Sequence, residues 1–278
     1  MVGLEPRIAM DPQILIDGHV HLHAGSKLER VLDTAAANFA AASAGAPWRG
    51  MLWLLELRGS TSFESLWRGA QARSVMLGGW RVSRPTDETV SVRAEHSGTG
   101  ARIDIVAGYQ IVTVERLEVC VVGTRQMLAD GSGLDATLEQ ALALDALTFL
   151  PWGAGKWTGE RGRAVDRALQ DARFQDRLFA ADNGGRPSLW QSPQIFAALE
   201  ARGRAVLSGS DPLPVPGDEQ RIGSFGFSTR ATLDDACPAA DLLRRLQGGQ
   251  PVRRFGSLLP LRDFLLAQLT LRFRPRTA

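Results

Sequence analysis

Ile14-Leu15-Ile16-Asp17-Gly18-His19-Val20-His21-Leu22-His23 is the stretch that decides the fold, and it holds three of the four histidines of this 278-residue chain. The apolar run followed by alternation predicts a buried strand that ends in polar residues. Because successive side chains of a strand point to opposite faces, the three histidines are expected to share one face. Two imidazoles at this spacing, those of His19 and His21, either hold a metal ion or are satisfied by backbone carbonyls at the strand end.

The composition narrows the class of protein. A chain of 278 residues is expected to form one main domain, and α/β barrels of about 250 residues are a common single-domain size. The net charge is only +2, with 32 basic and 30 acidic residues interspersed, so we expect neither nucleic-acid nor membrane binding. Two cysteines, Cys120 and Cys237, do not make a disulfide framework and fit a reducing compartment. No stretch approaches the ~20 apolar residues of a membrane span, so we expect a cytoplasmic protein.

Most of the chain alternates predicted strands with predicted helices, which indicates an α/β fold. The exception lies between about residues 74 and 107, where short alternating segments around a turn at 97–100 predict an antiparallel β meander inserted between the strand–helix units. Residues from about 230 to 278 are expected to form a C-terminal helical segment. We expect residues 1–278 to form a single domain.

Polar side chains follow several of the predicted strands. Glu56 lies near the end of the apolar run 51–57, and it is either paired with Arg58 or faces a site. Lys156 lies in a loop with two glycines and two tryptophans after the strand 147–150, and this loop is either part of a site or an exposed turn. Asp211 follows the predicted strand 205–208, where a carboxylate from a late barrel strand would enter a metal site.

Three of the seven tryptophans lie in loop-like segments. Trp152, Trp157 and Trp190 either shape the wall of a pocket or pack on the core from the surface.

The order of these strand ends resembles the polymerase-and-histidinol-phosphatase (PHP) family of metal-dependent phosphoesterases. Asp17-Gly18-His19-Val20-His21 looks like the opening Asp-x-His-x-His of that family, and Gly209-Ser210-Asp211 is similar to its late Gly-Ser-Asp-x-His. Between them, residues 108–111 and 118–123 are similar to its middle strands, and Asn183 occupies the place of an asparagine-bearing strand end. The likeness runs in order from about residue 13 to 226. It implies a distorted TIM-like (β/α)7 barrel that carries the inserted meander.

The chain also departs from the family pattern. Gln110 stands where the family has a glutamate, Cys120 where it has a histidine, and Leu213 where a histidine follows the late aspartate, while Glu56 is a conservative exchange. The resemblance therefore implies a reduced site for one divalent ion (zinc, manganese or iron). The implied ligands, sufficient in number for one ion, are His19, His21, Glu56 and Asp211.

The resemblance implies a hydrolase that acts on a small, anionic or phosphorylated molecule. Water on the ion would be the nucleophile, with Asp211 as an alternative proton acceptor and Lys156 as a second catalytic residue. Lys156 or Arg186 would neutralise the substrate, and the other expected substrate contacts are Gln110, Trp152 and Asn183.

Two alternatives remain open from the sequence. The loss of several family ligands favours a catalytically inactive barrel that binds a ligand or acts as a scaffold, with Gln110, Asn183 and Lys156 as hydrogen-bonding groups. A metal-free enzyme that uses Asp211 and Lys156 as acid and base is the third hypothesis.

Overall fold

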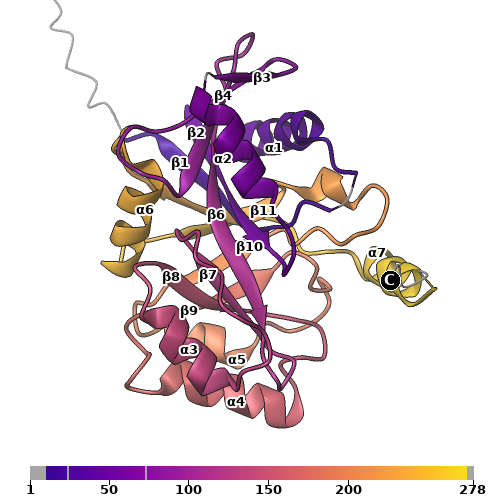
Figure 1. Ribbon diagram of the computed structural model, residues 1–278. Coiled ribbons are helices and arrows are strands. Elements are labelled where there is room, and N and C mark those ends of the chain that lie inside the picture. The colour runs from indigo at the N-terminus through magenta and orange to yellow at the C-terminus, as the bar shows by residue number, and fades with distance from the viewer. Residues whose placement is uncertain (1–10, 24, 73, 274–278) are drawn as a thin grey trace, which may run out of the picture.

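In the computed structural model, which describes residues 11–23, 25–72 and 74–273, one mixed β-sheet forms a nearly closed, barrel-like wall (Figure 1). The remainder of the expected domain, before residue 11 and after residue 273, lies outside the described residues. The strands of the main path, in the order in which they neighbour each other, are β10 (Val206–Gly209), β9 (Leu178–Asn183), β8 (Leu147–Pro151), β7 (Glu118–Val122), β6 (Arg102–Val112), β2 (Trp48–Glu56), β1 (Gln13–Val20), β11 (Phe225–Arg230) and β12 (Arg253–Gly256).

The sheet departs from the all-parallel order of a regular barrel. Parallel ladders join β8 to β9, β9 to β10, β2 to β6 and β1 to β2. Antiparallel ladders join β6 to β7, β7 to β8, β1 to β11 and β11 to β12. The sequence analysis expected residues from about 230 onward to be helical, but this segment also contributes β12, which pairs with β11 at the end of the path.

The wall closes where β10 lies against β1 and β11. Here the backbone N–H of Asp211 donates to the carbonyl of His19 at 2.8 Å. This contact brings the ends of the first and the last parallel strands to the same mouth of the barrel-like sheet.

The expected meander is antiparallel and consists of β3 (Val75–Leu77), β4 (Trp80–Ser83) and β5 (Ser91–His96), which pairs with β6. The expected end of the meander, at about residue 107, falls inside one continuous strand, because residues 102–112 form the single eleven-residue strand β6. This strand pairs with the meander along its first half and with β7 along its second half, so the meander is continuous with the main sheet.

Three buried clusters form the core, one inside the sheet and two between the sheet and its helices. One lies inside the sheet and includes Ile14, Ile16, Trp53 and Phe149, and α6 packs against it. A second lies between β1, β2, the meander and helices α1 and α2, and a third between β7–β10 and helices α3–α5. The helices are α1 (Leu28–Ala42), α2 (Ser62–Ala72), α3 (Leu134–Leu142), α4 (Gly159–Gln170), α5 (Gln194–Glu200), α6 (Pro238–Gln247) and α7 (Leu261–Phe273), with a 3-10 turn η1 (Asp218–Arg221).

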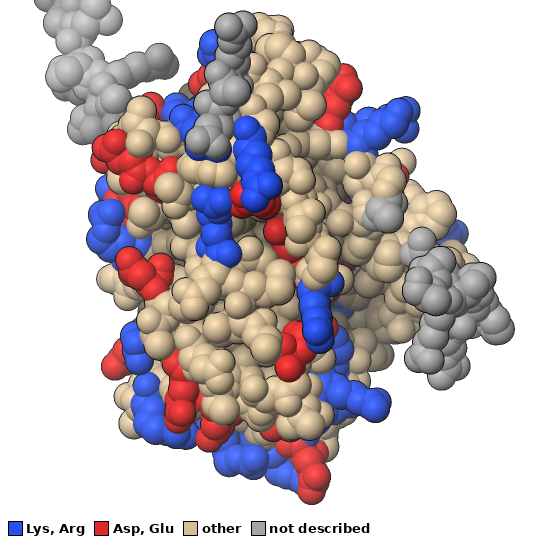
Figure 2. Space-filling model, viewed as in Figure 1, with Lys and Arg blue, Asp and Glu red and all other residues tan. Residues whose placement is uncertain are grey.

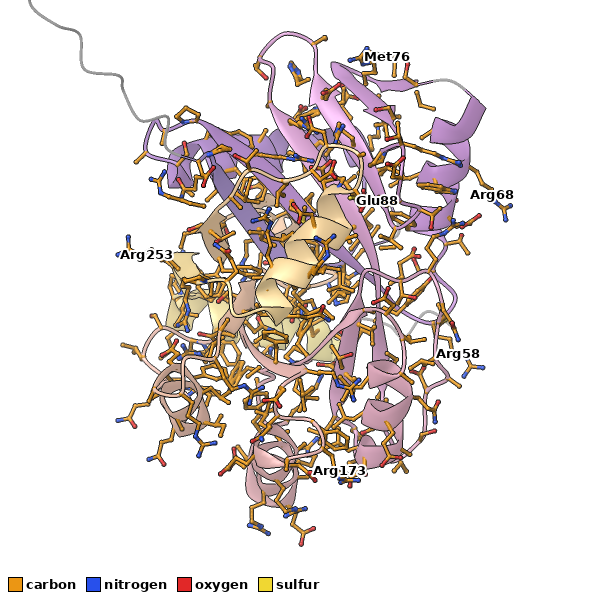
Figure 3. All side chains as sticks on the ribbon, turned by 90° about the vertical axis from the view of Figure 1, so that its left-hand side faces the viewer. Arg58, Arg68, Met76, Glu88, Arg173 and Arg253 are labelled. Carbon is orange, nitrogen blue, oxygen red and sulfur yellow. The ribbon has the colours of Figure 1, made fainter. Side chains whose placement is uncertain are left out.

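The first turn of α6 is held by a side chain from the segment before β5. Glu88 lies at the N-terminal end of this helix (Figure 3) and accepts hydrogen bonds from the backbone N–H groups of Ala239 (3.1 Å) and Ala240 (2.9 Å). A carboxylate at this position accepts hydrogen bonds from backbone N–H groups that have no partner within the helix. Its negative charge also interacts favourably with the positive end of the helix dipole. None of the helices in the described part of the chain is both long and apolar enough to cross a membrane.

Candidate metal centre

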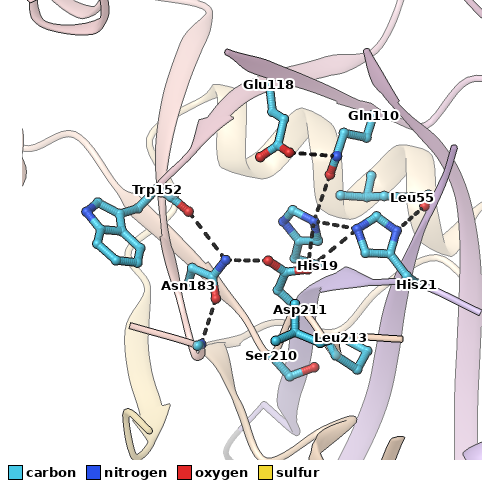
Figure 4. Close-up of polar contacts among 12 residues, drawn as sticks. His19, His21, Leu55, Gln110, Glu118, Trp152, Asn183, Ser210, Asp211 and Leu213 are labelled. Carbon is cyan, nitrogen blue, oxygen red and sulfur yellow. Dashed lines mark hydrogen bonds and ion pairs between the residues drawn. The ribbon is translucent and has the colours of Figure 1, made fainter. Parts of the chain in front are cut away.

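His19, His21 and Asp211 converge at the mouth of the sheet (Figure 4). The Nε2 atoms of His19 and His21 lie 3.0 Å apart, and each lies 3.5 Å from Asp211 Oδ1. Ligand atoms at the corners of a tetrahedron around zinc are separated by about 3.3 Å when the bonds are about 2.0–2.1 Å long. The triangle formed by the three side chains therefore has the size of a metal-binding site.

The two histidines face this mouth because β1 is irregular. Ile14 and Ile16 belong to the cluster inside the sheet, whereas Val20 belongs to the cluster outside it. The register with β2 shifts by one residue between Asp17 and Val20, which is the signature of a β-bulge. The bulge turns the face that would have pointed outward toward the inside, and His19 and His21 turn with it.

The backbone selects the tautomer of the neutral His21 ring. Its Nδ1 lies 2.7 Å from the carbonyl oxygen of Leu55, which can only accept a hydrogen bond. In the neutral ring Nδ1 therefore carries the hydrogen, and Nε2 presents its lone pair to the cluster. Burial lowers the pKa of His19 below its ordinary value, although the Asp211 carboxylate opposes this shift, so the neutral ring is favoured at His19.

Gln110 adds an oxygen to the cluster. Its Oε1 lies 3.1 Å from His19 Nε2, while its Nε2 donates to Glu118 Oε1 at 3.0 Å (Figure 4). Because a carboxylate only accepts, this bond sets which end of the amide points to His19. Lys156 in turn forms an ion pair with Glu118.

The atoms that converge at the mouth of the sheet are suited to bind a cation. The Nε2 of His21, Oδ1 of Asp211 and Oε1 of Gln110 are all acceptors that point toward one region, and His19 Nε2 supplies at most one proton to it. Acceptors gathered without protons repel one another, and a divalent ion removes that repulsion. Neutral imidazoles with one carboxylate suit zinc, iron and manganese.

Asp211 is positioned by strained backbone and by Asn183. Its φ of 46° lies in the left-handed region, which few residues other than glycine adopt. Burial alone would raise the pKa of Asp211, but His19, His21, the Asn183 amide and Arg221 outweigh it, so the pKa lies below its ordinary value. The carboxylate is therefore held ionised.

Asp17, which the sequence analysis quoted only as part of a motif, anchors the loop that carries Asp211. Its carboxylate is completely buried and accepts hydrogen bonds from the N–H (2.8 Å) and hydroxyl (2.6 Å) of Ser210 and from the N–H of Gly223 (2.8 Å). Burial raises the pKa of Asp17 to about 6, with these hydrogen bonds opposing the shift. The signal for this role was its place in the Asp-x-His-x-His pattern.

Two residues expected at the site are engaged elsewhere. Glu56 is buried and does not belong to the cluster, because its Oε1 accepts from the Ser60 hydroxyl (2.8 Å) and the Phe63 N–H (3.2 Å). It is the last residue of β2, and its carboxylate binds the segment that leads into α2. Arg186 is 3% exposed and binds Asp182 through two hydrogen bonds of 2.9 and 2.8 Å, so its charge is neutralised away from a substrate. Cys120, where the family has a histidine, is buried inside the sheet, and burial raises its pKa well above 9.0.

A cavity of about 1090 Å³ lies over the cluster and is lined by His21, Gln110, Trp152, Lys156, Asn183 and Asp211. His23 also lines it, with its Nε2 2.8 Å from the carbonyl of Pro212. Two exposed cations at the start of α1, Lys27 and Arg30, line the same cavity. Sequence reasoning missed them, and their only signal was that they follow the histidine strand directly.

The fold and the cluster together define a barrel-like α/β protein with a candidate metal site at one mouth of its sheet. No family model matches this chain, and no curated protein matches it in sequence.

PsfC and Endonuclease Q are among the solved structures similar to it. PsfC from Pseudomonas syringae PB-5123 is 17% identical, with a TM-score of 0.57 over 94% of this chain and 98% of that one. Endonuclease Q, in complex with a 27-mer duplex substrate with an abasic lesion at the active site, is 12% identical, with a TM-score of 0.50 over 92% of this chain and 67% of that one. At these identities the likeness concerns the fold alone.

Proposed function

We propose that this protein is a metal-dependent hydrolase of the PHP type, with a distorted TIM-like barrel and one divalent ion, that acts on a small phosphoester. The observation that carries the proposal is the triangle of 3.0, 3.5 and 3.5 Å between His19, His21 and Asp211. Three protein ligands with an open position are the arrangement of catalytic zinc sites.

The side chains of the cluster have two proposed roles, to bind the ion and to accept a proton. His19, His21 and Asp211 would hold the ion, and the Gln110 oxygen is oriented toward them. The ion, when bound, would act as a Lewis acid and lower the pKa of water to about 7. Asp211, ionised and partly exposed, can accept a proton through the carboxylate oxygen that receives the Asn183 hydrogen bond.

The charges of the cavity support an anionic substrate. Lys156 is paired with Glu118, so it contributes less positive charge than the sequence suggested. Lys27 and Arg30 line the same cavity as His23 and supply the cations that Arg186 does not. The carboxylates of Glu118, Asp211 and Glu219 balance the cations of the lining, so the bound ion would give the cavity its net positive charge. On the face shown in Figure 2 basic and acidic side chains are interspersed, which supports a small molecule over a long polyanion as the substrate.

Metal content and turnover test the proposal. Protein purified without a histidine tag is analysed for metals and then assayed on phosphoesters with zinc, manganese and iron. We expect about one ion per chain and metal-dependent hydrolysis. His19→Ala with His21→Ala should abolish metal uptake, and Asp211→Asn should abolish turnover.

His96→Gln is the matched control, because His96 packs on Trp80 and accepts from the turn that follows β5, far from the cluster in sequence. It should retain both metal and turnover. Metal uptake that survives the double substitution would contradict the site. Stoichiometric metal without hydrolysis of any phosphoester would instead favour the inactive, ligand-binding barrel.

A further inference from the structure

A second cavity adjoins the first. It has a volume of about 350 Å³ and shares Trp152 and Gly153 with the cavity over the metal cluster. We call it the tryptophan cavity, and its lining includes Trp152, Trp157, Trp190, Gln191, Gln194 and Asp166. All three tryptophans of the loop-like segments therefore border one space.

The rings of this cavity are held in place but not fully covered. Trp152 is 8% exposed and meets Trp190 edge to face, with the ring centroids 6.0 Å apart. Trp157 meets Phe196 of α5 edge to face at 5.6 Å. Trp190 is nevertheless 42% exposed and Trp157 is half-buried, so part of each ring remains open to a partner. Aromatic rings arranged in this way favour another planar ring.

The two cavities differ in charge. Lys27, Arg30 and Lys156 line the metal cavity together with the carboxylates of Glu118, Asp211 and Glu219, so a bound divalent ion would make that cavity net positive. Among the described residues around the tryptophan cavity the one charged side chain is that of Asp166, and none is a lysine or an arginine. The tryptophan cavity instead has the amides of Gln191 and Gln194 at its edge, which both donate and accept hydrogen bonds. An anionic group is favoured in the first cavity and an uncharged ring with heteroatoms in the second.

One residue connects the aromatic wall to the metal cluster. The side-chain amide of Asn183 donates to the carbonyl oxygen of Trp152 at 3.3 Å and also to Asp211. The backbone of Trp152 is therefore one side chain away from the cluster (Figure 4), and the two cavities meet at this residue.

We propose that the tryptophan cavity binds an uncharged aryl or heteroaryl ring, carried by a substrate whose phosphate lies at the metal cluster. The phosphate part rests on the proposed function, but binding of the ring does not. Trp190 and Trp157 are thereby assigned as residues that determine specificity.

Binding of the ring is tested first, on metal-free protein, by calorimetric titration with 1-naphthol and with adenosine. We expect one of the two to bind, and Trp190→Ala to weaken its binding about tenfold. Trp190→Phe should restore most of the affinity. Leu189→Ala is the control, because Leu189 is 74% exposed and adjacent in sequence but does not line the cavity.

The Gln194→Ala variant then distinguishes binding of an aryl ring from binding of a heteroaryl ring. This substitution should weaken adenosine and leave 1-naphthol unchanged if the glutamine amides recognise ring heteroatoms. Circular dichroism verifies that each variant is folded, and the Trp190→Phe protein keeps the test valid if Trp190→Ala does not fold.

Turnover is tested second, with 1-naphthyl phosphate, adenosine 5′-monophosphate and glycerol 2-phosphate in the presence of metal. Trp190→Ala should raise KM for the ester whose ring binds about tenfold and change neither its kcat nor the KM for glycerol 2-phosphate. Ring binding that depends on Trp190, without hydrolysis of any ester, would overturn the proposed function and leave the ring site standing. Hydrolysis with equal KM values for wild type and Trp190→Ala, or binding of neither ring, would overturn the ring site.

Discussion

At the scale of single residues, the chemistry of the site depends on which atoms carry protons. His21 has its proton directed by the Leu55 carbonyl, and Gln110 has its oxygen directed by Glu118. Neither partner is recognisable from the residue type or from its neighbours in the chain. The residue types were sufficient to nominate His19, His21 and Asp211, but not to exclude Glu56 and Arg186, whose partners Ser60, Phe63 and Asp182 are visible only in the fold.

The two thiols give a prediction at this scale. Cys120 is fully buried, and burial raises its pKa well above the 9.0 of an exposed thiol, so it stays protonated and inaccessible at pH 8. Cys237 is only half-buried. We expect Ellman's reagent to label one thiol per native chain at pH 8 and two in denaturant, and Cys237→Ser to abolish the native labelling.

The raised pKa of Cys120 also sets how the stability of the fold depends on pH. Because the pKa of Cys120 is raised on folding, its contribution to stability is complete below about pH 9 and decreases as the pH rises above that value. One rapidly labelled thiol in the native Cys237→Ser protein, or two in the native wild type, would show that Cys120 is not enclosed by the sheet.

At the scale of elements, the site depends on one irregular strand and one close contact. The bulge in β1 turns the histidine face inward, and the end of β10 then packs against it. A Cβ atom on Gly209 would lie 2.5 Å from His19 Cβ and 2.8 Å from the carbonyl carbon of Gly18. Only a glycine in β10 allows the two strands to approach so closely.

Substitution of Gly209 tests this contact. Gly209→Ala should lower the free energy of unfolding by about 3 kcal/mol or more, since the added methyl group meets backbone that has no room to move. Metal affinity should decrease with it, because the contact also sets the distance from Asp211 to the histidines. Urea denaturation and metal titration measure the two effects.

Gly69→Ala in α2 is the matched control. The added Cβ would meet only the Val75 side chain, at 3.4 Å, and the helix should gain about 0.5–1 kcal/mol. Equal stabilities for the Gly209→Ala protein and the wild type would show that β10 does not pack on β1 in this way.

At the scale of the whole molecule, the candidate site is formed by residues that are far apart in the sequence, so binding of an ion is coupled to folding. The carboxylate of Asp17 binds Ser210 across a separation of 193 residues, and Asp211 follows directly. An ion held by His19, His21 and Asp211 binds the folded state and not the unfolded chain, which lacks the arrangement.

Thermal unfolding measures this coupling. Metal at a hundredfold excess over its Kd should stabilise the protein by about 2.7 kcal/mol and raise Tm by about 5–10 °C. Asp211→Asn should lose most of this increase, and a chelator should reverse it in the wild type. An equal rise in Tm for wild type and for the His19→Ala, His21→Ala protein would place the metal elsewhere.

The sequence by itself determined the buried early strand that leads into the histidines, the α/β class, the antiparallel meander and the polar strand ends from which the cluster is drawn, but β1 ends at Val20, so His21 and His23 lie beyond the expected period-2 strand. These features depend on spacing and on the burial preferences of neighbouring residues, which are local properties. It did not determine the bulge in β1, the closure of the sheet by β10 or the continuity of β6 with the meander. It also left open whether Trp152, Trp157 and Trp190 pack on the core or border a cavity. The tertiary structure decided these points, because each depends on which distant backbone and side chains fill the space around a residue.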